Sequence, residues 1–294
     1  MELRHLRYFV AVAEELHFTR AARRLHMEQP PLSQQIRALE EELGVALLLR
    51  SKRHVALTGA GQRFLTDARR ILREAQQAAE DARRAARGEL GELRIGFSSS
   101  LPFTSLLPEV LRRYRHAHPD VTLTLREMFT IDQLEALQRD QIDIGLVRFR
   151  GSEPSSDLDL RQITRDPLRL VVNAGDPLAK RASVALAELK DYGFIVYPPG
   201  TGTSLTMLVR QLCLAAGFEP VVAQEAREPM AQIGFVAAGL GIAILPAPFE
   251  CVHLDDVRYV ALSDDGAHLS LGVAVRRAHQ SPLIDGFLDQ LKAE

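Results

Sequence analysis

Apolar residues recur every three or four positions in three segments near the start of the chain, and this spacing predicts three helices that each bury one face. The stripe of the first helix is Leu3, Leu6, Val10 and Ala13. We expect Thr19 to cap the second helix, because its hydroxyl can accept a hydrogen bond from a free backbone N–H. The third helix is expected to begin at Pro30 and Pro31, which a first turn tolerates, and to end at Gly44.

A short β-hairpin is predicted next, because two apolar runs, residues 45–49 and 55–57, flank the basic segment Arg50-Ser51-Lys52-Arg53-His54. Three helices followed by a basic hairpin are typical of a winged helix-turn-helix, in which one helix enters the major groove of DNA and a basic wing can reach the minor groove. The polar face of the third helix carries side chains able to bond base edges or phosphates: Gln29, Ser33, Gln34 and Arg37. Periodicity alone leaves open a three-helix bundle with an ordinary solvated face.

A long helix is predicted over residues 59–88, which follow the turn Gly59-Ala60-Gly61 and contain no proline. Apolar residues at alternating spacings of four and three form a heptad seam along it: Phe64, Ala68, Ile71, Ala75, Ala78, Ala82 and Ala85. Such a seam is typical of a helix that pairs with another helix. The alternative is a helix that packs its seam on its own domain.

The remaining residues, 89–294, alternate predicted strands and helices, which indicates an α/β domain with a parallel sheet. Strands are expected at 93–97, 121–127, 142–147, 168–173, 193–197, 221–223, 242–245 and 269–275. Helices are expected at 104–116, 132–139, 205–216 and 230–238, and from residue 282 onward.

Polar side chains follow several of these strands, where ligands of open parallel sheets gather. They are Ser98, Ser99, Ser100, Thr130, Arg148, Thr201, Thr203 and Ser204. The serines and Thr203-Ser204 precede predicted helices, whose free N–H groups and positive dipole ends favour an anion. Arg148 adds a fixed positive charge, unless it pairs with an acid such as Asp143. Together these residues predict a carboxylate receptor, although each polar cluster alone can be explained as a helix cap.

Composition supports a protein of more than one domain, because 294 residues exceed what one core usually holds. Residues 1–88 hold 16 Lys/Arg against 11 Asp/Glu, and the rest holds 20 against 27, so only the first part is suited to a polyanion. The start MELRHLRYFV has no signal-peptide core, no apolar run reaches the roughly 20 residues that span a bilayer, and two cysteines fit a reducing compartment. We therefore expect a cytoplasmic protein that does not enter a membrane.

Common enzyme signatures do not occur in the sequence. There is no G-x-S-x-G elbow, no G-x-x-x-x-G-K-[ST] phosphate loop and no H-E-x-x-H metal motif. We therefore expect no catalytic residues, no metal site and no cofactor.

The segment MELRHLRYFVAVAEELHFTRAARRLHMEQPPLSQQIRALEEELGVALLLRSKRHVALTGAG resembles the start of LysR-type transcriptional regulators nearly position for position. The likeness continues through the whole chain in GELRIGF, DIGLVRF and VAAGLGIAILPA. Within the family, the chain is most similar to regulators of benzoate, catechol and related aromatic-acid degradation.

This resemblance implies a winged helix-turn-helix at 1–58, a linker (dimerisation) helix at 59–88 and an effector-binding domain at 89–294 with a periplasmic-binding-protein-like fold. Lobe I of that domain would comprise 92–163 and 269–294, and lobe II would comprise 164–268. The DNA-binding residues implied are Gln29, Pro30, Pro31, Ser33, Gln34 and Arg37 in the recognition helix, with Arg50 and Arg53 in the wing. Family members often have arginine at the position of Gln34.

The same resemblance implies a homodimer or homotetramer on double-stranded promoter DNA. A small acidic effector of aromatic origin would lie between the lobes, against Ser99, Ser100, Thr130, Arg148, Thr203 and Ser204. The alternative function is a small-molecule-binding protein whose N-terminal helices serve only assembly.

Overall fold

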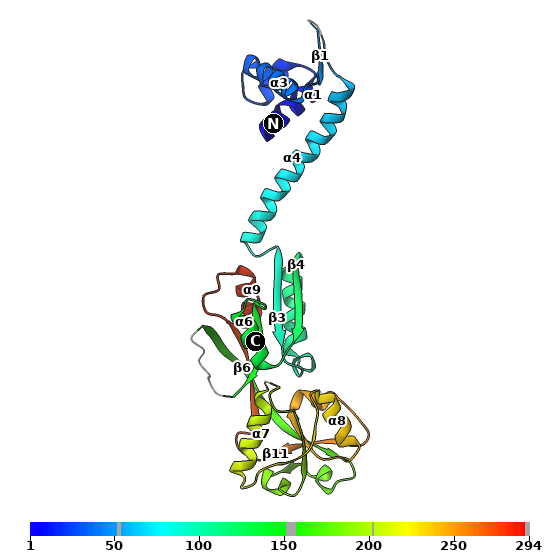
Figure 1. The fold of residues 1–294 in the computed structure, drawn as a ribbon, viewed down its shortest axis with the longest axis vertical. Coiled ribbons are helices and arrows are strands. Elements are labelled where there is room, and N and C mark those ends of the chain that lie inside the picture. Colours follow the sequence, from blue (N-terminus) through cyan, green and yellow to red (C-terminus); the bar gives the residue numbers. More distant parts are fainter. Residues whose placement is uncertain (52–53, 151–156, 202, 292–294) are drawn as a thin grey trace. The chain divides into compact units, whose positions relative to one another are not determined.

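The structure is a computed structural model, and it describes residues 1–51, 54–150, 157–201 and 203–291 of the chain. Its contacts divide the chain into two compact units, Met1–Ala85 and Ala86–Glu294 (Figure 1). Each unit has a hydrophobic core of its own.

The N-terminal elements are α1 (Leu3–Glu15), α2 (Phe18–Arg24), α3 (Gln29–Leu43), β1 (Leu48–Arg50), β2 (Val55–Leu57) and α4 (Gly59–Ala86). The three short helices and the hairpin share one core, in which Phe9, Ile36 and Leu39 are completely buried. The two strands pair antiparallel, with Leu48 opposite Leu57. The predicted winged helix-turn-helix is therefore confirmed.

Two details of the predicted helical module are wrong. His17, not Thr19, caps α2, because the helix begins at Phe18 and the Thr19 N–H donates to Nδ1 of His17 at 3.2 Å. In α1 the buried face is rotated toward Phe9, whose ring meets that of Phe64 with centroids 5.1 Å apart. Leu3 is consequently 43% exposed instead of buried.

The first residues of the predicted α4 seam pack against the winged module of the same chain. Gly61 lies so close to the backbone of Leu47 that a Cβ would be 2.0 Å from the carbonyl oxygen, so only glycine fits there. Beyond it, Phe64 and Ala68 pack against the core of the winged module. The later seam residues Ala78, Ala82 and Ala85 are exposed.

The second unit is built on one sheet of eight strands and a separate pair. The large sheet has the order β4-β3-β5-β12-β6-β11-β7, with β10 also paired to β6, and the small sheet joins β8 to β9. The strands are β3 (Gly91–Phe97), β4 (Val121–Glu127), β5 (Ile144–Phe149), β6 (Leu158–Asn173), β7 (Ser183–Val184), β8 (Gly193–Val196), β9 (Val221–Glu225), β10 (Ala243–Pro246), β11 (Val257–Leu262) and β12 (His268–Arg276).

The predicted parallel sheet is in fact mixed. β3 runs parallel to β4 and β5, but β12 is antiparallel to both β5 and β6. The prediction inferred a parallel sheet from the alternation of strands and helices, whereas β12 follows β11 without a helix between them. Strands β7 and β11 and the first part of β6 were not predicted.

Two cores on either side of β6 define two lobes. One core gathers Leu93, Val110 and Phe287, and the other gathers Leu170, Phe194 and Ile233. The helices around them are α5 (Leu106–Ala117), α6 (Thr130–Gln138), α7 (Ser204–Ala215), α8 (Pro229–Ala237) and α9 (Pro282–Leu291), with short 3-10 helices η1 (Leu101–Phe103), η2 (Pro177–Lys180), η3 (Leu186–Leu189) and η4 (Ala247–Cys251). Among the described residues, no helix is both long and apolar enough to cross a membrane.

Candidate DNA-binding face and effector site

The polar face of α3 is open, as the sequence predicts. Gln29, Pro30, Pro31, Gln34 and Arg37 are exposed. Ser33 is half-buried, while the opposite face of the helix is closed by the buried stripe Leu32, Ile36 and Leu39. Arg37 has no ion-pair partner among the residues that the structure describes, so its charge is available to a phosphate.

The wing residue Arg50 is tied to its own module. Its guanidinium pairs with Glu40 and lies over the ring of Phe18, 5.2 Å from the centroid. Glu40 also accepts hydrogen bonds from the backbone N–H groups of Leu47 and Leu48, at 2.8 and 3.0 Å. Arg50 would therefore have to leave this internal ion pair to contact DNA from the wing. Arg53, the other predicted wing residue, lies outside the described residues.

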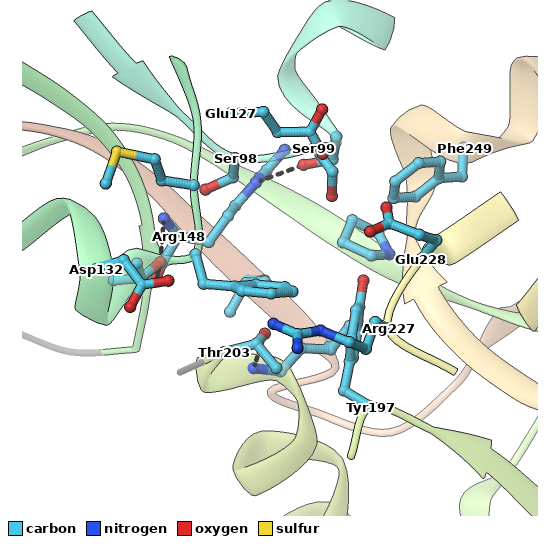
Figure 2. A pocket seen from close by; sticks show the side chains of 17 residues that line it. Ser98, Ser99, Glu127, Asp132, Arg148, Tyr197, Thr203, Arg227, Glu228 and Phe249 are labelled. Atoms are coloured by element: carbon cyan, nitrogen blue, oxygen red, sulfur yellow. Dashed lines mark hydrogen bonds between the residues drawn. The ribbon is translucent and has the colours of Figure 1, made fainter. Parts of the chain in front are cut away.

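A cavity of about 380 Å³ lies between the two lobes (Figure 2). Lobe I contributes Ser98, Ser99, Ser100, Glu127, Met128, Phe129, Thr130, Asp132 and Arg148, and the rest of the lining is Tyr197, Thr203, Leu205, Arg227, Glu228, Pro246, Phe249 and Leu269. Five of the six predicted effector residues line this cavity. The sixth, Ser204, does not.

Arg148, from β5, is the buried cation of the cavity. Its side chain is 5% exposed, its Nε donates to Oγ of Ser100 at 3.0 Å, and it forms an ion pair with Asp166 of β6. Burial lowers the pKa of Arg148, and the charge of Asp166 opposes that shift. Its third nitrogen, Nη2, is buried without a hydrogen-bond partner among the described residues.

The expected alternative partner of Arg148 was Asp143, and the structure shows otherwise. Asp143 accepts hydrogen bonds from the Arg94 side chain at 2.7 and 3.0 Å and contacts Arg276. Arg148 lies near the other end of β5 and pairs instead with Asp166 of β6, across the antiparallel strand β12.

The side-chain hydroxyls of Thr130, Thr203 and Ser204 form hydrogen bonds with backbone groups. The hydroxyls of Thr130 and Ser204 donate to the carbonyl oxygen of Arg148, at 2.8 and 3.0 Å. Thr203 caps α7 by accepting from the Leu205 N–H at 3.2 Å, which leaves its own proton free to donate. Ser204 therefore connects the two lobes through the backbone of Arg148 and does not face the cavity.

Ser99 and Ser100 do not lie at the N-terminus of a long helix, although the sequence predicted that they do. These serines lead into the three-residue helix η1, while α5 begins only at Leu106. The anion-binding feature next to Ser100 is the Arg148 guanidinium, not the N-terminus of a long helix.

The sequence analysis missed the tyrosine and the acids of the cavity. Tyr197 is 6% exposed and lines the cavity together with Ser99. Burial raises the pKa of Tyr197, and the charges of Glu228 and Glu127 raise it further. Burial and the charge of Glu228 also raise the pKa of Glu127. Glu127 is the last residue of a strand. The rule that ligand-binding residues follow strand ends, which identified Thr130, could therefore have identified Glu127 as well.

Within the described residues, no group of three or more histidine, cysteine, aspartate or glutamate side chains is arranged to hold a metal ion.

Comparisons with known proteins match both parts of the chain. Residues 3–62 match the bacterial regulatory helix-turn-helix model of the lysR family, and residues 86–294 match the LysR substrate binding domain. The chain belongs to the LysR family of bacterial transcriptional regulators.

Relatives of this LysR-family regulator are similar over nearly their whole length. It is 45% identical to the uncharacterized HTH-type transcriptional regulator YnfL of Escherichia coli, over 98% of this chain and 96% of YnfL. It is 39% identical to the transcriptional regulator BenM of Acinetobacter baylyi, over 99% of this chain and 95% of BenM.

Solved structures agree with this fold. Full-length CbnR, crystallised with its target DNA, has a TM-score of 0.82 at 32% identity and covers 99% of both chains. The BenM effector binding domain with its effector benzoate has a TM-score of 0.61 at 32% identity, covering 69% of this chain and 90% of that one. This LysR-family protein is therefore a DNA-binding transcriptional regulator with an effector-binding domain, and not an enzyme.

Proposed function

We propose that this LysR-family regulator binds promoter DNA and changes that binding when a small carboxylic acid enters the cavity between its lobes. The observation that carries the proposal is the unpaired Nη2 of Arg148. A buried N–H group without a partner costs free energy, and a ligand carboxylate is an acceptor that would satisfy it.

On the DNA side, the open face of α3 is the surface that enters the major groove. Gln29, Ser33, Gln34 and Arg37 would meet base edges or phosphates there, while Pro30 and Pro31 shape the first turn. Arg53 would serve the wing, and Arg50 would do so only by leaving Glu40. The relative CbnR, crystallised on its target DNA, supports this assignment.

The exposed part of the α4 seam would pair two copies of the chain, and two such pairs would make a tetramer. Ala78, Ala82 and Ala85 have small side chains, so two helices can approach closely along them. Pairing would place two recognition helices on two half-sites of a double-stranded promoter. The regulator would act in the cytoplasm, where bacterial DNA lies, and would need no cofactor besides its effector.

On the effector side, the carboxylate would lie against Arg148 and Ser100, with the Thr203 hydroxyl as a further donor. Phe129, Phe249 and Leu205 give the cavity apolar walls that suit a ring or a hydrocarbon chain. The structure of the BenM domain with benzoate is consistent with an aromatic acid in this class of domain.

The acid would act by favouring one arrangement of the lobes. A ligand that contacts both lobes shifts their equilibrium by the difference in its affinity for the two arrangements. The altered lobe angle would then change how the paired winged modules sit on DNA. Activation or repression of the promoter would depend on that geometry.

A thermal-shift experiment with benzoate and its uncharged isostere benzamide tests the effector proposal. Benzoate at ten times its Kd should stabilise the protein by about 1.4 kcal/mol and raise its Tm, because it binds only the folded chain. Benzamide should have little effect. Ser100→Ala should lose most of the benzoate shift, whereas Ser105→Ala, an exposed serine that makes no cap hydrogen bond, should keep it. Equal shifts from both compounds would contradict a carboxylate site.

Binding to a promoter fragment tests the DNA side and separates it from the alternative of a binding protein whose N-terminal helices serve only assembly. Gln34→Ala should reduce the difference in binding free energy between the target and other sequences by about 1–3 kcal/mol per lost base contact. Arg37→Ala should make the affinity depend less steeply on salt concentration. Glu41→Gln, an exposed change outside this face, serves as the control. Unchanged preference and salt dependence in the Gln34→Ala, Arg37→Ala double variant would place the DNA-binding face elsewhere.

A further inference from the structure

The charges around the cavity do not suit a ligand that is only an anion. Three carboxylates line it, those of Glu127, Asp132 and Glu228, and none of them has an ion-pair partner among the residues the structure describes. The two guanidiniums of the lining belong to Arg148 and Arg227, and Arg148 already pairs with Asp166. A second negative charge on the ligand would therefore meet repulsion.

Two of these acids, Glu127 and Glu228, come from different lobes. Glu127 ends β4 in lobe I, and Glu228 precedes α8 in lobe II. The charges of both raise the pKa of Tyr197, and all three residues line the same cavity as Ser99. Figure 2 shows Glu127 near Ser99 and the Tyr197 hydroxyl pointing toward them.

Arg148 points to a ligand independently. Its Nη2 group is buried and has no partner among the described residues, and its side chain is 5% exposed. Apolar side chains such as Phe129 and Phe249 also line the cavity. The cavity thus combines a buried N–H group that lacks an acceptor, carboxylates that lack a cation and apolar walls.

We propose that the effector is a zwitterion, whose carboxylate lies at Arg148 and Ser100 and whose ammonium group lies between Glu127 and Glu228. This inference rests on the proposed function, because it takes the carboxylate to bind at Arg148. An ammonium group has three donors, which match the two carboxylates and a hydroxyl of Ser99 or Tyr197. Since Glu127 and Glu228 come from different lobes, a cation between them replaces repulsion between the lobes with attraction and favours their closure.

Calorimetric titration of the full-length protein at pH 7 tests this with three probes of the same shape. They are 4-(aminomethyl)benzoate, 4-(hydroxymethyl)benzoate and 4-methylbenzoate. We expect the ammonium compound to bind at least tenfold more tightly than the other two. In the Glu127→Gln, Glu228→Gln double variant this preference should disappear, whereas Glu225→Gln, an exposed acid of lobe II outside the cavity, should keep it.

The same comparison with 6-aminohexanoate and hexanoate tests the preference for an ammonium group in ligands without an aromatic ring. If neither amino acid binds more tightly than its uncharged-end counterpart, the zwitterion proposal is overturned, and binding of the plain acids would leave the carboxylate site standing. Equal affinity for the hydroxymethyl and aminomethyl compounds would also overturn it, because a neutral donor would then suffice. If no acid binds, both proposals fail.

Discussion

Arg148 and Asp166 form an ion pair across β12, the strand that lies between β5 and β6 in the sheet. The pair leaves one nitrogen of Arg148 without a partner, in a cavity that both lobes line. Asp166 offsets the buried charge of Arg148. Under the proposed function, a ligand carboxylate would compete with Asp166 for this charge, so two residues would set the affinity for an acid, and only Arg148 lines the cavity.

Glu40 should stabilise the winged module, because its carboxylate accepts from two backbone N–H groups of the hairpin and pairs with Arg50. Glu40→Ala leaves these donors without their acceptor and should lower the free energy of unfolding by about 1–3 kcal/mol. Urea unfolding of the full chain, followed by fluorescence of a dye attached in the module, measures this. Glu41→Ala, one position along on the exposed side of α3, should change stability far less. Equal losses in the two variants would contradict the bridging role of Glu40.

Two threonines one turn apart at the start of α7 should respond differently to the same substitution. Thr203 caps the helix, so Thr203→Val should destabilise the domain by about 1 kcal/mol. The Oγ1 atom of Thr206 is buried with no partner among the described residues, so Thr206→Val should be neutral or stabilising. Thermal unfolding of both variants checks this, and a larger loss for Thr206→Val would show that the hydroxyl has a partner such as water.

The seam of α4 beyond the winged module should hold the dimer together. Ala75→Glu places like charges in the paired seam and should weaken association by at least tenfold. Gln76→Glu adds the same charge at an exposed neighbouring position outside the seam and should leave association intact. Light scattering over a dilution series measures both. An undisturbed assembly in Ala75→Glu would mean that the chain pairs through other surfaces.

Glu127 should make stability depend on pH. Its pKa is raised in the folded state, by burial first and by Glu228 second. The ionised carboxylate therefore destabilises the fold at pH 7, and this penalty disappears as the pH falls through the raised pKa to below its ordinary value. Glu127→Gln should accordingly raise the Tm at pH 7 and lose this advantage near pH 3.5. Glu225→Gln is the control, and a gain that is constant with pH would contradict the assignment.

Much of the fold could be predicted because most elements have a regular apolar pattern. The amphipathic helices and the buried strands of the sensor follow their expected periods, and the glycine at position 44 ends α3 as predicted. The first part of β6 escaped because it crosses between the lobes with much of its length exposed, so its sequence LDLRQITRDP has no apolar alternation. β11 carries too few buried residues for a clear period.

The site was predictable only as far as chain topology places residues at strand ends. That rule found Ser100, Thr130 and Thr203, but it gave no means of pairing Arg148 with Asp166. Their contact depends on the antiparallel course of β12, which brings residues from β5 and β6 to the same face. Ser204 was misplaced for a related reason, because the cap residue and its neighbour in a helix point in different directions.

Calorimetric titration of benzoate into the wild type, Asp166→Asn and the Arg148→Gln, Asp166→Asn double variant tests the central claim most directly. Asp166→Asn frees the charge of Arg148 and should bind benzoate most tightly, although its unliganded fold should be less stable by about 3 kcal/mol. The double variant replaces the ion pair with two amides and should bind at least tenfold more weakly than the wild type, because hydrogen bonds to charged groups contribute about 1.5–3 kcal/mol. Equal benzoate affinity in the wild type and the double variant would show that Arg148 does not hold the acid.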